Sequence, residues 1–559
     1  MKHLFVLLVV LLCARTLEAQ CNGYVQNTLG DANAYSVSSV IDNDDNIYTV
    51  GYFSGTMTVG TAVLKPSIRP VGIFLTKIDK NGQLVFTKLI AETNGVDVQS
   101  PNIAVGSNEI MIEGVARDSL VVGNTTYTKQ SFSSVFYVIK LTKDAALIWS
   151  KGYYFNDPLR TGAFGGIVSD RNGGAFVTTT FRDTLDIGIK QLINKNLPIL
   201  VMHIDDKGNI TWAKMSGLVG GYAKRIALDG AGNVLLAGEL DGGIQFDDKS
   251  TGDGTVTNIF RLFVASFGND GSTHWLWAAQ PNAGATASSR KTILNDLKCD
   301  KMDNIYLTGF MGDSVQFDNV KVVGRSSMYV AKLNPSGSII WAQKKSGQVS
   351  GRPELGFMAI DSNQNIYFAG TFVDSTYFGT QKYTGIKGGS WFLAHFIDSS
   401  HWDHVTIGQN TGTAYPQSVM STSRDSITVV ISFQGNSTSF KGMAATNGTD
   451  TNSGVYNLAW FGACTLGNSV EENLSFEKGF TIFPNPATNK LHIKFGNSFR
   501  GEIKYEILNE LGNGLADGKI LSVNGETDIL LDKKMIKSGI YFLKIQIGEH
   551  IFSQKFVVK

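Results

Sequence analysis

The feature that most constrains the fold is a sequence phrase that returns about every 63 residues along most of the 559-residue chain. Each copy has a short β-rich segment ending in Asp, a turn, a strand resembling NIY, and often a glycine followed by an aromatic residue. Clear copies are VIDNDDNIYTVGYF, ALDGAGNVLLAGEL, KCDKMDNIYLTGF and AIDSNQNIYFAGTF, and three others are more divergent. The sequence therefore predicts seven repeats, whose equivalent positions are Gly51, Gly114, Thr179, Gly238, Gly309, Gly370 and Ile431.

Each copy continues with a third β segment, such as GIFLTKID or SMYVAKLN. Most copies then have a fourth segment built around a large aromatic residue, such as ALIWSKG or SIIWAQK. Turns such as DKNGQ and NPSGS place glycine where a hairpin needs positive φ. Four alternating strands per copy are typical of a propeller blade, which must stack on its neighbours around an axis to bury both faces. The predicted fold class is all-β, a seven-bladed β-propeller followed by a small antiparallel β-sandwich.

The two ends of the repeat region complement each other. The seventh copy stops at NLAWFGACTLG without a fourth strand, whereas GYVQNTLG, from Gly23, precedes the first strand of copy one. We therefore expect the N-terminal segment to complete blade seven, within a propeller of residues 20–466. Cys21 and Cys464 would lie across this hairpin, so a disulfide between them is predicted, with two unrelated cysteines as the alternative. Cys299 is expected to be a buried, unpaired thiol.

The first residues, MKHLFVLLVVLLCARTLEAQ, predict a signal peptide of residues 1–19 with cleavage after Ala19. Its apolar run is too short to span a membrane, and no later segment reaches the roughly 20 apolar residues of a spanning helix. No transmembrane segment is therefore predicted in the mature chain. Lipid attachment at Cys21 is the weaker alternative, because Gln20 replaces the small residue expected before a lipidated cysteine.

Charge excludes some classes of partner. Charged residues make up 17% of the chain, the formal net charge is +1, and no long run of one sign occurs. Nucleic-acid and anionic-membrane binding, which need a clustered basic face, are not predicted. No cofactor is predicted either.

The repeat resembles a bacterial propeller-repeat family whose units follow the pattern Asp-x-x-x-Asn-x-Tyr, then Gly, Lys-hydrophobic-Asp, Gly and Trp-Ala. The resemblance extends over about residues 23–464. It implies the propeller fold and says little about function, because one fold hosts many functions.

A different pattern follows a polar linker at residues 467–478. Residues 479–559 alternate between strands and Gly- or Asn-rich turns, as in a small antiparallel sandwich. This segment resembles the type A C-terminal sorting domain of the type IX secretion system of Bacteroidota. The residues that carry the resemblance are Phe483, Pro484, Asn485, Pro486, Leu491, Ile493, Gly539, Ile540, Tyr541 and the basic-hydrophobic end from Lys555 to Lys559. The resemblance implies the secretion machinery as a partner, passage through the periplasm and outer membrane, removal of this domain, and either surface attachment or release.

One segment, HFIDSSHWDHV, suggests a metal site because it gathers His395, Asp398, His401, Asp403 and His404. His395, however, occupies the position of Lys77, Lys140 and Lys332 in other copies, which favours an ordinary polar position. His401 and His404, three residues apart on a strand, would point to opposite faces. No metal site is therefore predicted here.

Two recurring patterns also allow a functional or a structural interpretation. The Asp-rich turn at residues 42–46 could bind calcium, but it lacks the spacing of an EF-hand loop and is better explained as a turn. A recurring aromatic position could stack on sugars, but contact between blades is the favoured interpretation. Its members are Phe86, Trp149, Trp212, Trp277 and Trp341.

The sequence contains no nucleophile elbow, phosphate-binding loop or metalloprotease helix. The favoured function is therefore a non-catalytic module at the cell surface or in the medium that binds an extracellular glycan or protein. The alternative is a hydrolase or lyase acting on extracellular polysaccharide, with residues from several blades meeting at the channel mouth. A purely structural surface-coat component is a third possibility.

Overall fold

The computed structural model describes the chain from residue 24 to residue 559 with internal gaps. These gaps are residues 31–32, 96–100, 129–133, 156–164, 189, 219–220, 253–259, 281–291, 313, 325–326, 345–355, 373–374, 379–380, 386–389, 397–401, 424, 436, 441–442, 447–455, 465–479, 496–500, 510–513, 523–525, 533–535 and 548–549. Within the described residues the regular elements are all strands, which confirms the all-β prediction. The chain forms two compact units, of which one comprises residues 21–466 and the other includes residues 467–559.

In the described part of the first unit, seven sheets each contain a run of four antiparallel strands, and we call these the repeat sheets. The first three are β2 (Asn33–Ile41), β3 (Ile47–Ser54), β6 (Val71–Ile78) and β7 (Leu84–Thr93); β8 (Asn102–Val105), β9 (Glu109–Arg117), β12 (Ser134–Thr142) and β13 (Leu147–Phe155); and β14 (Gly165–Ser169), β15 (Ala175–Thr180), β18 (Ile199–Ile204) and β19 (Ile210–Met215). The fourth and fifth are β20 (Gly221–Leu228), β21 (Val234–Leu240), β24 (Arg261–Phe267) and β25 (Thr273–Ala278); and β26 (Thr292–Cys299), β27 (Ile305–Met311), β30 (Ser327–Leu333) and β31 (Ile339–Lys344). The sixth and seventh are β32 (Gly356–Ile360), β33 (Ile366–Phe372), β36 (Ser390–Phe396) and β37 (Trp402–Ile407); and β39 (Ala414–Ser421), β40 (Ile427–Gln434), β43 (Tyr456–Cys464) and β1 (Tyr24–Gly30).

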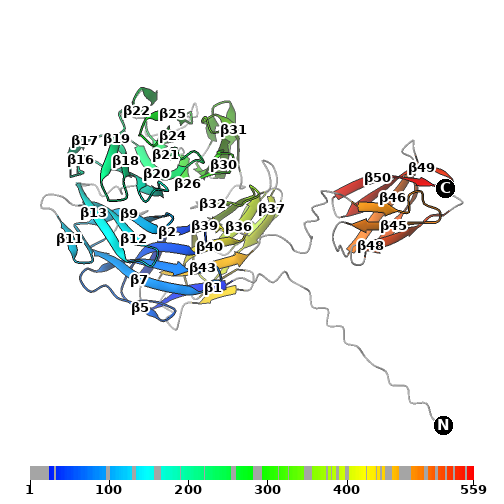
Figure 1. Cartoon of the computed structure of the whole chain (residues 1–559), viewed down its shortest axis with the longest axis horizontal. Helices are drawn as coiled ribbons and strands as arrows, with labels where there is room; N and C mark the ends of the chain where they lie inside the picture. The colour runs from blue at the N-terminus through cyan, green and yellow to red at the C-terminus, as the bar shows by residue number, and fades with distance from the viewer. Residues whose placement is uncertain are drawn as a thin grey trace, which may run out of the picture. The chain divides into compact units, whose positions relative to one another are not determined.

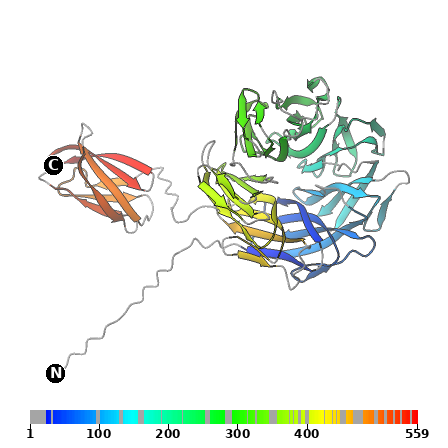
Figure 2. The same cartoon turned by 180° about the vertical axis from the view of Figure 1, so that it is seen from behind.

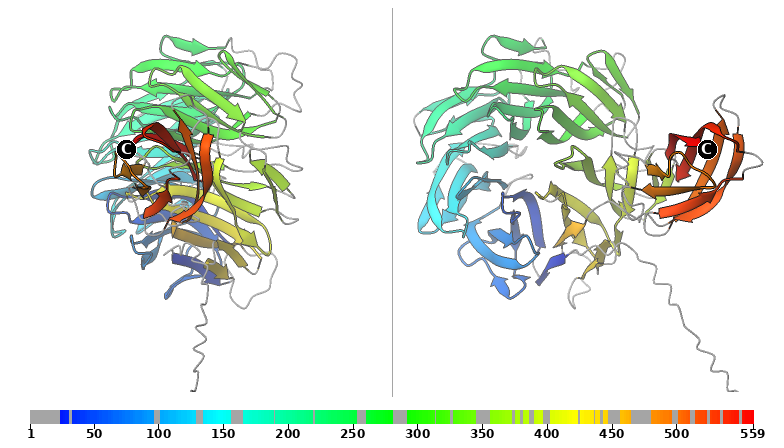
Figure 3. Two further views of the ribbon diagram at one scale, coloured as in Figure 1. Left: turned by 90° about the vertical axis from the view of Figure 1, so that its right-hand side faces the viewer. Right: turned by 45° about the vertical axis from the view of Figure 1, so that its right-hand side comes forward.

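The repeat sheets follow one another in chain order, from blue through green to yellow (Figures 1 and 3). The first strand of each sheet lies next to the first strand of the following sheet, and β39 of the seventh lies next to β2 of the first. Apolar side chains of adjoining sheets pack together in the core. For example, Ile73 in the first sheet and Ile112 in the second are fully buried in one cluster. Stacking therefore buries the faces that one sheet alone would leave exposed.

The N-terminal strand β1 is held on both of its edges (Figure 2). Residues 24–27 pair with β43, beginning with Tyr24 opposite Gly462, and residues 28–30 pair with β4 (Met57–Val59) of the first repeat. In addition, the buried Thr28 hydroxyl accepts a hydrogen bond from the Leu458 N–H at 2.8 Å. The first strand in the described sequence thus supplies the fourth strand of the last repeat sheet.

Between its second and third strands each repeat carries a further hairpin, which the sequence analysis missed. The hairpins are β4 with β5 (Ala62–Leu64), β10 (Ser119–Val122) with β11 (Thr125–Thr128), β16 (Asp183–Asp186) with β17 (Gln191–Asn194), β22 (Ile244–Phe246) with β23 (Lys249–Thr251), β28 (Ser314–Phe317) with β29 (Val320–Val323), β34 (Ser375–Phe378) with β35 (Gln381–Thr384), and β41 (Ser437–Phe440) with β42 (Met443–Thr446). Four of them form strand pairs with the preceding repeat: β4 with β1, β10 with β7, β16 with β13, and β41 with β38 (Gln409–Asn410). Single bridges, Gln245 with Gly217 and Gln316 with Gln280, connect β22 and β28 to their preceding repeats. These hairpins cover outer strands that would otherwise be open sheet edges.

A β-bulge explains why glycine recurs in the repeat. In the first, fourth and fifth repeat sheets the first strand carries one extra residue opposite Gly51, Gly238 and Gly309. A Cβ atom at these glycines would lie only 1.9–2.0 Å from a carbonyl oxygen of the bulged strand. Glycine is therefore required there for the close approach of the two backbones.

The recurring Asp, Asn and Tyr of the repeat form one hydrogen-bonded turn. In the fifth sheet, Asp300 accepts the N–H groups of Met302 and Asn304, both at 2.9 Å, together with the Asn304 amide and the Tyr306 hydroxyl. Burial raises the pKa of Asp300, but these hydrogen bonds and Lys332 outweigh it, so the pKa lies below its ordinary value. The motif is a turn whose carboxylate is already satisfied.

The same turn also joins neighbouring sheets. Asp425 accepts the Ser362 N–H at 2.7 Å between the seventh and sixth sheets. Asp45 accepts the Ser423 N–H at 2.6 Å between the first and seventh. The contact between the last repeat and the first is thus of the same kind as a contact between consecutive repeats.

The second unit contains two antiparallel sheets. One consists of β44 (Phe480–Phe483), β45 (Lys490–Phe495) and β48 (Glu526–Leu530), and the other of β47 (Gly514–Ser522), β46 (Gly501–Asn509), β49 (Gly539–Ile547) and β50 (His550–Val558). Leu491 and Ile493 of the first sheet and Leu543 and Ile545 of the second are fully buried in one core.

Candidate functional site

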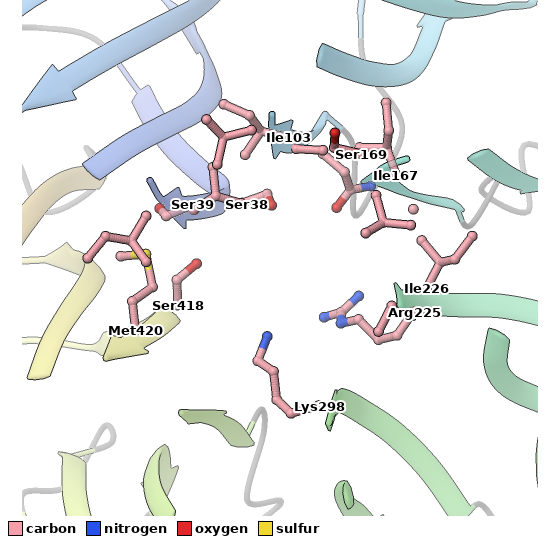
Figure 4. Close-up of a pocket in the computed structure, with 18 of the residues that line it drawn as sticks. Ser38, Ser39, Ile103, Ile167, Ser169, Arg225, Ile226, Lys298, Ser418 and Met420 are labelled. Atoms are coloured by element: carbon pink, nitrogen blue, oxygen red, sulfur yellow. The ribbon is translucent and has the colours of Figure 1, made fainter. Parts of the chain in front are cut away.

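A cavity of about 750 Å³ lies among the first strands of the repeat sheets. Residues of β2, β8, β14, β20, β26, β32 and β39 line it. Figure 4 shows Ser38, Ser39 and Ser418 on one side of the cavity and the cationic ends of Arg225 and Lys298 across from them. Its volume falls within the usual range of small-molecule sites.

The β-bulges opposite the recurring glycines also shape this cavity. In β20 the extra residue is Lys224, and in β26 it is Asn295. A bulge shifts the alternation of side chains by one residue. The residues that immediately follow, Arg225 and Asp296, both line the cavity.

Two cations share one carboxylate at the cavity wall. The Asp296 Oδ1 atom lies 3.7 Å from Arg225 Nε and 3.4 Å from Lys298 Nζ. Asp296 also accepts the Leu297 N–H at 2.9 Å and the Met358 N–H at 3.1 Å. The carboxylate is therefore fixed by the backbone as well as by the two side chains.

Arg225 lies in a partly apolar environment. Its guanidinium is 5.7 Å from the centre of the Phe357 ring and donates to the Lys224 carbonyl at 2.8 Å. Burial lowers the pKa of Arg225, and the charge of Asp296 opposes this effect. Cation–π contact and the carboxylate together stabilise a charge that is only partly hydrated.

A second buried pair supports the adjoining strands. Lys224 Nζ lies 3.8 Å from Glu239 Oε1, and that same oxygen accepts the Leu294 N–H at 2.9 Å. Both side chains of the pair are more than nine-tenths buried. Glu239 thus ties β21 to the first strand of the next sheet.

One buried carboxyl group lies behind the cavity wall. Glu113 accepts a hydrogen bond from the Asn102 amide at 2.7 Å and is 1% exposed. Burial raises its pKa to about 8, against the hydrogen bond from Asn102, which lowers it. A Cβ atom added to the cavity-lining Gly165 would lie 3.2 Å from Glu113 Oε1. Burial therefore favours the uncharged form of Glu113, and its carboxyl group lies close to the cavity.

The charged residues of the cavity were not predicted from the sequence. The only signal available was charge in segments that form the first strand of a repeat, in YAKRIALD and ILNDLKCD, where other copies have apolar residues or serine. Because these segments are about 70 residues apart, no local motif joins them.

The predicted disulfide lies outside the described residues, since Cys21 precedes them and the side chain of Cys464 is not described. It remains a prediction. Cys299 is a free thiol, partly buried at the cavity wall. Burial raises its pKa to about 12.

The hypothetical metal cluster is only partly described: Asp398 and His401 lie outside the described residues, as do the side chains of Asp403 and His404. His395 stacks on Tyr367 with ring centres 4.6 Å apart. In the fifth sheet Lys332 lies over Tyr306 in the same way, at 4.8 Å. Among the described residues no group of three or more potential ligands could hold a metal ion.

The recurring aromatic position lies between repeat sheets, as expected, but one assignment was wrong. In β25 the residue paired with the third strand at this position is Trp275, opposite Ser266, and not Trp277. The segment HWLWAAQ offers two tryptophans on one face, and only the strand register separates them. The indole N–H groups of Trp149, Trp212 and Trp275 donate to the carbonyls of Asp206, Asn269 and Pro335 in the following sheets.

The sorting motif joins the two ends of the second unit. Phe483 ends β44, and Pro484, Asn485 and Pro486 follow it; all four residues are exposed. The Asn485 side chain accepts the Val557 N–H at 2.9 Å. The remaining motif residues lie on the last two strands or at the end of the chain: Gly539, Tyr541, Lys555 and Lys559. Tyr541 packs on Phe556 and donates to the Lys537 carbonyl, whereas Lys555 and Lys559 are exposed.

Residues 481–559 match the protein family described as the secretion system C-terminal sorting domain. This domain indicates type IX export to the cell surface or into the medium. Among the described residues no helix is long and apolar enough to cross a bilayer. The chain is thus an exported all-β protein that carries a C-terminal sorting domain.

No curated protein matches the chain. Among solved structures, it is similar to the polysaccharide lyase Uly1, with 9% identity and a TM-score of 0.37 over 76% of this chain and 89% of that one. It is also similar to the intramolecular trans-sialidase from Ruminococcus gnavus, with 9% identity and a TM-score of 0.30 over 71% of this chain and 89% of that one.

Proposed function

We propose that this protein is a cell-surface or released seven-bladed β-propeller that binds an extracellular glycan or protein. The propeller interpretation is supported by the neighbouring first strands and by the contact of β39 with β2. The pairing of β1 with β43 supports closure of blade seven by the N-terminal strand. The proposed organisation is a signal peptide at residues 1–19, a propeller at 20–466, a linker at 467–478 and a sorting domain at 479–559.

The observation that carries the binding role is the cavity, about 750 Å³ in volume and lined by polar and cationic side chains from several sheets. Its wall is built on the bulged strands of a repeated scaffold, so the side chains are held by rigid elements. Such a concave site with a few placed polar groups is suited to a small ligand or to part of a larger one.

The role is tested with the chain from residue 20 to residue 559 on an array of glycans and polysaccharides, scored for both binding and cleavage. Binding without cleavage supports the proposal. The absence of binding to every glycan, together with the absence of binding to proteins of the same cell surface, would refute it.

Glu113 is the specific observation that favours the alternative of a hydrolase or lyase. An uncharged carboxyl group near neutral pH can act as a general acid if substrate reaches it. Product release that is lost in a Glu113→Gln variant, while binding is kept, would support this alternative. Cleavage that persists in Glu113→Gln would exclude Glu113 as the acid.

Export depends, in this proposal, on the type IX machinery as a partner. Deleting residues 479–559 is expected to leave the protein in the periplasm, as measured by fractionation and immunoblotting. Unchanged surface and medium levels would refute the dependence.

A further inference from the structure

We propose that the cavity selects anionic saccharides, with a carboxylate or sulfate ester held between Arg225 and Lys298. This inference rests on the proposed binding function and names the chemical class of its ligand.

The cavity wall carries a surplus of positive charge that faces the open space. The side chain of Asp296 is 5% exposed, whereas those of Arg225 and Lys298 are 26% and 43% exposed. The buried carboxylate is shared between two cations and also accepts the N–H groups of Leu297 and Met358. One negative charge cannot neutralise both cations, so the pair presents a net positive charge to a ligand.

The environment of this positive charge strengthens its attraction for an acid group. The guanidinium of Arg225 lies over the Phe357 ring in a cavity wall, where water is partly excluded and a charge–charge contact is stronger than at an open surface. A planar acid group can accept two N–H bonds from a guanidinium, and lysine can add a third donor. The side chains are therefore suited to a carboxylate or a sulfate.

The remaining side chains that line the cavity fit a sugar. Ser38 and Ser39 on β2 and Ser418 on β39 lie across the cavity from the cations (Figure 4). The Ser418 hydroxyl donates to the Gln417 carbonyl and the Ser39 hydroxyl is hydrogen-bonded to Thr49. Both oxygens can still accept a hydrogen bond from a saccharide hydroxyl, and the Ser38 hydroxyl can donate as well. The cavity volume suits a short acidic oligosaccharide or the acidic end of a longer glycan rather than a folded protein.

The test is calorimetric titration of the chain from residue 20 onward with three probes. Oligogalacturonate carries carboxylates, a sulfated galactan oligosaccharide carries sulfate esters, and maltotriose carries no charge. The first two probes distinguish the two sources of anionic charge. The variants are Lys298→Gln and Arg225→Gln, with Arg225→Lys as the charge-conserving variant.

Lys321→Gln is the matched control, because Lys321 lies exposed on β29 outside the cavity. Near-ultraviolet circular dichroism confirms that each variant is folded. Lys298→Gln is especially informative, because the Lys298 side chain is 43% exposed, so its replacement disturbs the core little.

We expect at least one acidic probe to bind more tightly than maltotriose, and its affinity to fall about tenfold or more in Lys298→Gln and Arg225→Gln. Arg225→Lys retains part of the affinity, and Lys321→Gln is unchanged. Equal binding of maltotriose and both acidic probes, or full affinity in folded Lys298→Gln, would overturn this inference while leaving the binding role intact. No binding of any saccharide or protein would overturn both.

Discussion

Replacing Thr28 with valine tests whether the N-terminal strand is an integral part of the last repeat sheet. Thr28 is 1% exposed, and its hydroxyl accepts the Leu458 N–H at 2.8 Å across 430 residues of sequence. Valine has nearly the same shape but no acceptor, so Thr28→Val leaves the Leu458 N–H buried without this hydrogen bond. The cost of a buried, unsatisfied donor is about 1–3 kcal/mol, which is the expected loss in the free energy of unfolding.

Thr376→Val is the matched control. Thr376 is also 1% exposed, but its hydroxyl has no hydrogen-bond partner among the described residues. Valine there removes a buried polar atom without breaking a bond, so stability is expected to stay the same or rise by up to about 1 kcal/mol.

Urea unfolding followed by tryptophan fluorescence measures both variants, in the chain from residue 20 onward. All 8 tryptophans lie between residues 149 and 460, so their emission reports on the repeat sheets and not on the sorting domain. A lower midpoint at constant slope indicates lost stability. The reasoning is refuted if Thr28→Val unfolds at the wild-type urea concentration, or if Thr376→Val loses as much as Thr28→Val.

Three further outcomes are expected. The pKa of Glu113 in the folded protein, about 8, is raised above its ordinary value of 4.5. As the pH rises from 4.5 to 8, the unfolded chain loses this proton before the folded protein does, so the free energy of unfolding of the wild type falls by up to about 1.4 kcal/mol per pH unit. Glu113→Gln should therefore match the wild type near pH 4.5 and exceed it by an increasing margin up to pH 8 in thermal unfolding; a constant difference would contradict this. In the sorting domain, Asn485→Ala removes the acceptor of the Val557 N–H and should cost about 0.5–1.5 kcal/mol, whereas Asn485→Asp keeps the acceptor and most of the stability; equal losses would count against the hydrogen bond. Peptide mapping without reduction should recover Cys21 linked to Cys464, and free thiols at both positions would refute the disulfide.

Periodic features of the chain could be predicted from sequence, because each copy repeats the same physical requirement. The turn around Asp300 needs an Asn and a Tyr at fixed positions later in the sequence, because both bind the Asp300 carboxylate. A glycine is needed at the position of Gly309, because a backbone carbonyl approaches closely there. Both requirements leave a repeated pattern in the sequence. The sorting motif, in contrast, was recognisable from its resemblance to a known family, and the structure shows that its Asn485 binds the backbone of the last strand at Val557.

Other features could not be predicted because they depend on contacts between distant segments. The hairpin strands β4 and β5 have three residues each, too few for a clear alternating pattern, and β4 pairs with β1, a strand of the seventh repeat sheet. Arg225, Asp296 and Lys298 meet only because bulged strands of two consecutive sheets lie side by side. Neither the β20 segment nor the β26 segment alone indicates that Arg225 and Lys298 lie close together.

The two-sided pairing of β1 has a practical consequence for recombinant work. A chain that begins at the first complete repeat, after residue 30, would lack the strand that occupies both β43 and β4. Two unpaired strand edges would then face solvent, and such edges recruit strands from other molecules. Shortened chains of this kind should form strand-exchanged oligomers or aggregates even though every repeat phrase is present. An N-terminal affinity tag would be attached close to the pairing of β1 with β43.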